Sequence, residues 1–194
     1  MKHFSTRELF DYWNARRGRR PAPERGEIEP TAIRRVLADT FILGFDEPAA
    51  HPFRIAGTRV CALFTRELKG EGFLPLWEGG SRNLLRDLIA NVTDETVGMV
   101  AGVSAAGPHE DRLDLELLLL PLRHHGRTDT RVIGTLAPLN VPYWLGAHRL
   151  SGLTLGSLRY LGTSFVPRDL PARAPVLPNG RIKHGLVVYD GGQA

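Results

Sequence analysis

Apolar side chains recur with a helical period soon after the chain begins, and four of them are large: Leu9, Phe10, Tyr12 and Trp13. Ser5 and Glu8 have the spacing of a capping box, and Gly18 suits the position just past a helix end. The pattern predicts an amphipathic helix of about three turns. Its apolar stripe needs a partner surface.

The next segments change period twice. Pro30, followed by Ile33, Val36 and Leu37, predicts a second, short helix. Residues 40–45 and 51–58 are short apolar runs around an Asp-Glu-Pro turn, which indicates a β-hairpin. Helical spacing returns in residues 59–68 and again behind Ser81, the expected N-cap of a longer helix.

Strict alternation then predicts a three-stranded meander over 96–107, 111–125 and 130–139. One face of the middle strand carries Leu113, Leu115, Leu117 and Leu119; the other carries Asp114 and Glu116, then Leu118, Leu120 and Leu122. Both faces are therefore apolar at one end, so the N-terminal helix or a second subunit should pack there. The expected interface residues are Leu9, Tyr12, Trp13, Leu118 and Leu120.

The C-terminal part has weaker patterns. Residues 148–162 contain too many glycines for a helix assignment, and the four prolines of 164–180 indicate an extended linker. Residues 181–192 have the pattern of a terminal strand, which we expect to add to the edge of a sheet, either its own or that of another subunit.

Composition fits one sizeable core, because 42% of the 194 residues are hydrophobic and 24% are charged. The single cysteine, Cys61, excludes an intramolecular disulfide and a multi-cysteine zinc site, so we expect a reducing, cytoplasmic setting. No apolar stretch of signal-peptide or membrane-span length is present. The net charge of +4 equals the basic excess of residues 1–35 alone.

Several stretches together resemble a known family: FRIAGTRVCALFTRELKGEGFLPLW (53–77), YWNARRGRRPAPERGEIEP (12–30), ELLLLPL (116–122), VIGTLAPL (132–139) and WLG (144–146). They are similar to the alphaproteobacterial single-domain PAS family (PAS_5), formerly a domain of unknown function. The resemblance covers nearly all of 8–162. It implies an α+β PAS fold with a five-stranded antiparallel sheet and helices on one face. The expected division is an N-terminal helical segment (1–38), a PAS core (39–145) and a C-terminal extension (146–194).

The PAS resemblance also implies a cavity between the sheet and the short helices, able to take a small apolar ligand. Its expected lining is Phe41, Leu43, Phe53, Ile55, Cys61, Phe64, Phe73, Trp77, Met99 and Ala101. Arg54 and Arg59 flank the cavity segment, although Arg54 alternates with apolar neighbours and should face solvent. No cofactor is expected, because the segment matching the flavin-reactive cysteine (70–73) has no cysteine and 81–95 has no histidine for haem. Cys61 should be a packing residue.

The sequence therefore predicts a non-catalytic sensory or regulatory PAS protein that forms a homodimer and acts on an unidentified protein partner. One alternative is a small cone-like α+β enzyme using Asp114, Glu116 or His109. Another is a nucleic-acid binder through the arginines of 16–20. No metal site is expected, since His109, His124 and His125 fall in turns without the spacing of a helical metal pair.

Overall fold

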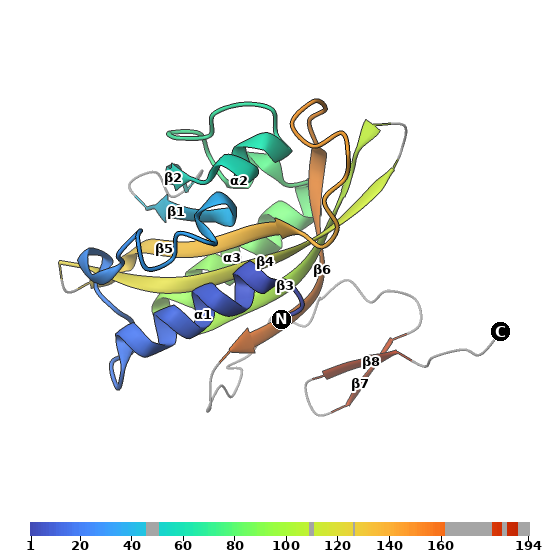
Figure 1. Cartoon of the computed structure of the whole chain (residues 1–194). Coiled ribbons are helices and arrows are strands. Elements are labelled where there is room, and N and C mark those ends of the chain that lie inside the picture. Colours follow the sequence, from blue (N-terminus) through green and yellow to red (C-terminus); the bar gives the residue numbers. More distant parts are fainter. Residues whose placement is uncertain (46–50, 109–110, 126, 162–179, 184–185, 190–194) are drawn as a thin grey trace. The chain divides into compact units, whose positions relative to one another are not determined.

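The computed structural model describes residues 1–45, 51–108, 111–125, 127–161, 180–183 and 186–189 (Figure 1). The chain divides into two compact units, residues 1–163 and residues 164–194. The first unit contains one sheet with helices on both faces, and the second contains a two-stranded sheet.

The first unit is built on a six-stranded antiparallel sheet in the order β2-β1-β5-β4-β3-β6. Its strands are β1 (Thr40–Gly44), β2 (Phe53–Ala56), β3 (Gly98–Ala106), β4 (Arg112–His124), β5 (Arg127–Pro138) and β6 (Ser151–Leu161). The predicted hairpin (β1–β2) and meander (β3–β5) are confirmed, as is the mixed α+β class. The expected number of five strands was wrong, because β6 pairs with β3 at the sheet edge.

Glycines hid β6 from the sequence analysis. The β3–β6 register shifts between Ala101 and Val103, and the two backbones approach closely there: a Cβ at Gly156 would lie 3.2 Å from the Gly102 carbonyl oxygen. Gly152 has a φ of +39°, which side-chain-bearing residues rarely adopt. These glycines are therefore required by irregular strand pairing.

Helices cover the two faces of the sheet unequally (Figure 1). The inner face packs against α2 (Thr58–Leu63), the 3-10 helix η3 (Leu74–Leu76) and α3 (Gly79–Asp94), and the opposite, outer face packs against α1 (Phe4–Arg17). The predicted division of β4 is confirmed: Leu113, Leu115, Leu117 and Leu119 belong to the inner core, and Leu118, Leu120 and Leu122 to the outer one. The expectation that the N-terminal helix or a second subunit packs on that second face is met by α1 of the same chain.

Three local predictions need correction. The N-cap of α1 is His3, whose Nδ1 accepts a hydrogen bond from the Ser5 N–H at 3.1 Å, so the capping box at Ser5 was wrong. Glu78, not Ser81, is the N-cap of α3. The Ser81 hydroxyl instead accepts a hydrogen bond from the Leu155 N–H of β6 at 3.0 Å. Ser5 and Ser81 thus each form a hydrogen bond with a residue distant in sequence, Asp39 and Leu155 respectively, instead of capping a helix.

The predicted second helix forms successive turns that end in the 3-10 helix η2 (Leu37–Asp39). Its backbone bonds join residues three apart, such as Ile33 N–H to the Pro30 carbonyl at 3.2 Å. A further 3-10 helix, η1 (Arg25–Glu27), precedes it. Burying Ile33 and Val36 under the outer core thus needs only turns, not an α-helix.

The second unit pairs β7 (Gly180–Lys183) with β8 (Leu186–Tyr189) in antiparallel fashion. The prediction of a single strand over 181–192 was wrong, since two short strands pair with each other there. The proline-rich stretch predicted as a linker lies, except for Gly180, outside the described residues.

Candidate functional site

The inner core is centred on four aromatic side chains: Phe41, Phe53, Phe73 and Trp77. Each is at most 1% exposed, and successive rings lie 5.3 to 5.8 Å apart between centroids. The predicted lining residues Leu43, Phe64, Met99 and Ala101 belong to the same buried cluster, and Cys61 packs against it. Nine of the ten predicted residues thus meet in or against one cluster, in which the aromatic rings contact one another.

Ile55 is the tenth residue, and its predicted place was wrong. Its side chain is 43% exposed, and it lines a groove on the outer face of the sheet. The cause is a β-bulge: Leu43 pairs with Phe53 while the adjacent Ile42 pairs with Ile55, so Arg54 is an extra residue in β2. The bulge breaks the alternation that would have placed Phe53 and Ile55 on one face. Arg54 is exposed, as predicted.

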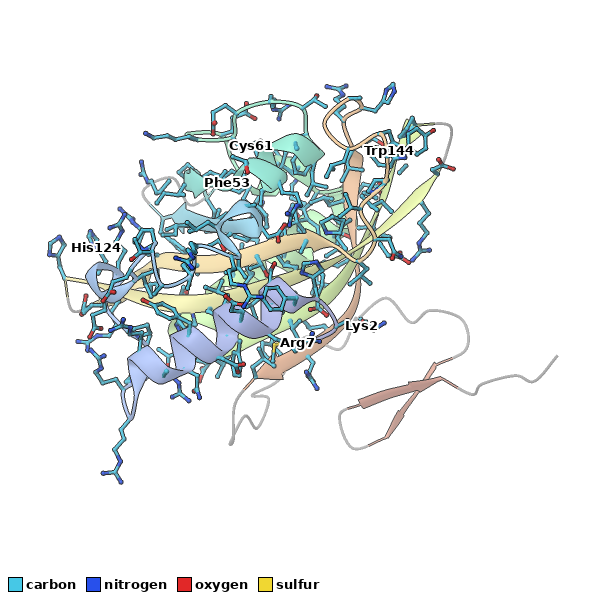
Figure 2. The ribbon with its side chains drawn as sticks, in the orientation of Figure 1. Lys2, Arg7, Phe53, Cys61, His124 and Trp144 are labelled. Carbon is cyan, nitrogen blue, oxygen red and sulfur yellow. The ribbon has the colours of Figure 1, made fainter. Side chains whose placement is uncertain are left out.

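Cys61, labelled in Figure 2, lies on α2 and packs against the inner core. Its Sγ is 3.5 Å from Glu67 Oε1 and 3.9 Å from the Ala56 carbonyl oxygen. Burial raises the pKa of the Cys61 thiol, and the negative charge of Glu67 adds to the effect. The protonated thiol is a poor nucleophile, which agrees with a packing role.

Three buried polar atoms in the described part of the chain lack a hydrogen-bond partner: Asp39 Oδ1, His51 Nδ1 and Trp77 Nε1. Trp77 Nε1 is the one in the aromatic cluster, where a polar ligand atom would satisfy it. His51 contacts the Phe45 ring at 4.6 Å between centroids. Burial lowers the pKa of His51, and the positive charge of Arg86 adds to this, against an opposing contact with the Gly44 backbone. Sequence analysis missed His51, which has no helical or strand pattern around it.

Helix α1 packs on the outer face through the residues predicted as an interface. Leu9 and Trp13 are buried with Leu118 and Leu120, and Trp13 Nε1 donates to the Pro121 carbonyl oxygen at 2.8 Å. The Tyr12 hydroxyl donates to the Glu27 carbonyl and accepts from the Glu29 N–H. These five predicted residues therefore make contacts within one chain.

A buried carboxylate joins the two helical layers at one end of the sheet. Asp39 Oδ2 accepts a hydrogen bond from the Ser5 hydroxyl of α1 at 2.6 Å and pairs with Arg59 Nη1 of α2 at 2.7 Å. Asp39 is fully buried, so water does not replace either partner. Arg59 was expected beside the cavity, and the structure gives it Asp39 as a partner. Asp39 itself was missed, because nothing local marks a carboxylate whose partners lie 34 and 20 residues away.

Glu116 holds the start of α1 from the other side. Its carboxylate accepts the backbone N–H groups of Lys2 at 2.6 Å and His3 at 3.1 Å, and it is 6% exposed. Glu116 is therefore buried and structural, unlike Asp114 of the same strand. Asp114 is exposed and pairs with Arg112 at 2.9 Å, while His109 lies outside the described residues. The two carboxylates bind different groups, and no shared reaction centre unites them.

Three of the four arginines in 16–20 have protein partners that compete with nucleic acid. Arg16 pairs with Glu29 at 3.0 Å, and Arg20 with Glu27 at 2.9 Å. The guanidinium of Arg17 lies 5.1 Å from the centre of the Trp13 ring. These contacts explain the basic run as support for the C-terminal end of α1.

Neither a metal-ligand cluster nor a membrane-spanning helix is present among the described residues. Among them, no three His, Cys, Asp or Glu side chains gather as metal ligands would. The rings of His124 and His125 contact each other at the end of β4, 4.2 Å apart between centroids and tilted by 50°. No helix in the described ranges has the length and apolarity needed to cross a membrane.

Comparison with known proteins gives one family. Residues 1–137 match a family model, PAS_5, described as a PAS domain. The match begins before α1 and ends within β5, so it includes both partners of Asp39. No curated protein matched the chain.

Proposed function

Because this chain belongs to the PAS domain family, we propose that it is a non-catalytic regulatory protein whose signal is the docking of α1 on the sheet. A PAS domain indicates a sensory or regulatory role. The observation that carries the proposal is the Asp39 carboxylate, which binds Ser5 of α1 and Arg59 of α2 through the same oxygen. A change on the inner face therefore reaches the outer face through one group.

The coupling follows from the position of α2. This helix covers the aromatic cluster, and its N-cap Gly57 donates its N–H to the Thr40 carbonyl, next to Asp39. A ligand or partner that shifts α2 also shifts Arg59. Asp39 then loses its cation, and the Ser5 hydroxyl loses a fixed acceptor. A hydrogen bond to a charged group contributes about 1.5–3 kcal/mol, enough to change the docked fraction of α1 by an order of magnitude or more.

A small apolar ligand would enter the inner core only if the aromatic rings separate, because they are in contact in this structure. Trp77 Nε1 offers such a ligand one hydrogen-bond donor. Ring separation would displace α2, since Val60 and Leu63 of that helix belong to the same cluster. Ligand entry and α1 release are thus linked in the proposed mechanism.

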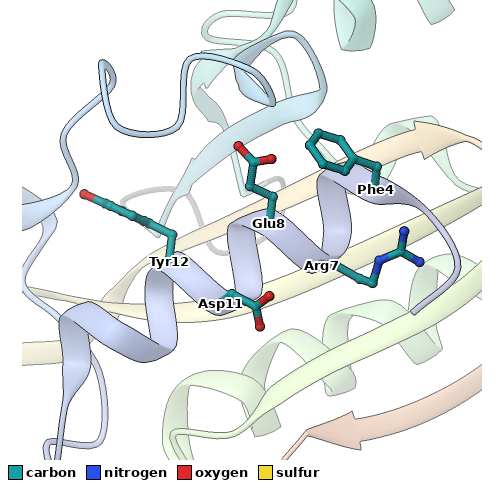
Figure 3. A pocket seen from close by; sticks show the side chains of 5 residues that line it. All are labelled: Phe4, Arg7, Glu8, Asp11 and Tyr12. Atoms are coloured by element: carbon teal, nitrogen blue, oxygen red, sulfur yellow. The ribbon is translucent and has the colours of Figure 1, made fainter.

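The proposed homodimer would use the outward side of α1, because Leu9 and Trp13 are buried within the chain. Figure 3 shows Phe4, Arg7, Glu8, Asp11 and Tyr12 along this side, and together they line a shallow depression. Phe4 is 41% exposed. Cationic and anionic groups lie close together here, so two copies related by a two-fold axis would match each other's charges.

The test compares wild type with Arg59→Gln, and uses Arg66→Gln as the control because Arg66 pairs with Glu71 on the surface. Amide hydrogen exchange of α1 and the set of co-purified proteins are measured on the same preparations. We expect faster exchange in α1 and an altered partner set for Arg59→Gln alone. Unchanged partners despite faster exchange in α1 would refute the role of α1 as the signal. Native mass spectrometry of gently purified protein would report the dimer and any retained ligand.

A further inference from the structure

The first turn of α1 and the residues just before it are held on the sheet by hydrogen bonds. Glu116 of β4 accepts from two backbone N–H groups ahead of the helix. The Ser5 hydroxyl donates to Asp39, and the Thr6 hydroxyl shares a hydrogen bond with that of Thr135 at 3.3 Å. The side chains that meet here are at most 6% exposed, so this half of the contact is buried and polar.

The rest of α1 is held mainly by apolar packing. Leu9 and Trp13 are at most 3% exposed and lie among the outer leucines of β4. The Tyr12 hydroxyl adds two hydrogen bonds to the loop that follows the helix. Met1 is the member of residues 1–8 that packs against this outer core, and its side chain is only partly buried. The two halves of the contact therefore differ in chemistry.

Water acts differently on the two halves when they leave the sheet. Lifting the start of α1 exposes hydroxyl, N–H and carboxylate groups, and water replaces most of the hydrogen bonds that are lost. Lifting the rest exposes Leu9 and Trp13, and transfer of their apolar surface into water has no such compensation. The start of the helix is therefore the half that opens more easily.

Glu116 has an unusual environment for a buried carboxylate. Among the described residues, no Lys, Arg or His side chain forms an ion pair with it. Its charge is balanced by two N–H groups at the positive end of the α1 dipole, where the helix has no acidic residue of its own in the first turn. A buried charge without a cation carries a desolvation penalty, which opening relieves.

We propose that α1 opens in part: residues 1–8 form a latch that lifts from the sheet, and residues 9–17 remain as an anchor. Glu116 holds the latch closed through the N–H groups of residues 2 and 3. Opening uncovers Asp39, Glu116 and Thr135, so the open state presents two carboxylates that the closed state hides. The latch rests on the proposed function, since it specifies which part of α1 carries the signal.

The first test is Glu116→Gln in the full-length protein. Asp114→Asn is the matched control, because Asp114 lies on the same strand and pairs with Arg112 on the surface. Amide hydrogen exchange is followed by mass spectrometry in peptides that report the latch and the anchor separately. We expect latch exchange to be about fivefold faster or more in Glu116→Gln, with anchor exchange changed by less than about twofold. Asp114→Asn should change neither.

The second test closes the latch with a covalent bond. The hydroxyl oxygens of Thr6 and Thr135 are 3.3 Å apart, so Thr6→Cys with Thr135→Cys places two thiols within reach of a disulfide. Cys61→Ala in the same chain removes the competing thiol. Oxidation should slow latch exchange about tenfold or more relative to the reduced form of the same variant, which is the control, and leave the anchor unchanged.

Three results would overturn the latch. Equal acceleration of latch and anchor in Glu116→Gln would mean that α1 leaves the sheet as one unit. Unchanged latch exchange after oxidation of the disulfide variant would mean that the first turn does not exchange by lifting from β5. An equal effect of Asp114→Asn would assign the change to the charge of β4 rather than to the contact with residues 2 and 3.

Proteins that co-purify with the oxidised and reduced forms separate the latch from the proposed function. Different partner sets, together with exchange changes confined to residues 1–8, would support both. Identical partner sets with the same confined changes would support the latch and refute signalling by α1.

Discussion

Ser5 and Arg59 share one oxygen of Asp39, which leads to a quantitative prediction about the coupling of these two residues. Ser5→Ala removes the hydroxyl that donates to Asp39 Oδ2 at 2.6 Å, and Arg59→Gln removes the cation at 2.7 Å. If Asp39 couples α2 to α1, the effects of the two changes on α1 should not add. Independent contacts would give simple additivity.

The magnitudes follow from burial. Ser5 and Asp39 are both buried, so losing their hydrogen bond should cost about 1.5–3 kcal/mol. The Arg59 side chain is 37% exposed. The stability lost when Arg59 is replaced should therefore lie between the values for surface and buried ion pairs, at about 2 kcal/mol. After Arg59 is removed, Asp39 is less firmly held and Ser5 contributes less. We therefore expect the double variant to lose about 0.5–1.5 kcal/mol less than the sum of the single losses.

The assay is amide hydrogen exchange, reported as the opening free energy of α1, with urea unfolding as the global measure. A loss of 2 kcal/mol speeds exchange about 30-fold. A control cycle of Ser5→Ala with Arg66→Gln should be additive, because Arg66 pairs with Glu71 instead. Additivity of the Ser5 and Arg59 changes within about 0.3 kcal/mol would refute the coupling.

Three further predictions concern single sites. Burial lowers the pKa of His51, so below about pH 6.5 the unfolded chain binds a proton that the folded chain does not. The stability that His51 contributes should therefore be full above about pH 6.5 and be lost as the pH drops through the folded pKa. His51→Gln should flatten this loss in urea titrations at several pH values. Gly57→Ala should destabilise the protein by about 2 kcal/mol or more, since its Cβ would overlap the backbone of η2, whereas Gly80→Ala, with open space at the start of α3, should stabilise it by about 0.5 kcal/mol. Thr96 has a φ of +52° between α3 and β3, so Thr96→Gly should raise the melting temperature by a few degrees.

Each has an outcome that contradicts it. A pH profile unchanged by His51→Gln would place the proton-linked destabilisation at other groups. Equal stability of the Gly57 and Gly80 variants would show that the close approach of α2 to η2 relaxes at no cost. A lower melting temperature for Thr96→Gly would mean that backbone entropy outweighs the relief of strain.

The sequence by itself determined the parts whose cause is periodic. The two leucine rows of β4 required two apolar layers, because successive side chains of a strand point to opposite faces. The stripe of Leu9 and Trp13 supplied the cover for the second layer, and Gly18 ended the helix as expected. The ten expected lining residues came from the PAS resemblance instead, and nine of them belong to the inner core or pack against it.

Only the tertiary structure decided the features that depend on distant partners. Ile55 faces outward because β2 contains a bulge, which the alternation of its residues does not reveal. Ser5 leaves the helix cap for Asp39, and Glu116 is buried by the backbone of residues 2 and 3 rather than exposed. Strand β6 forms despite its glycines because β3 offers it an edge. Local pattern reports which face a side chain prefers, whereas a buried charge takes its role from whichever groups the fold brings within hydrogen-bonding distance.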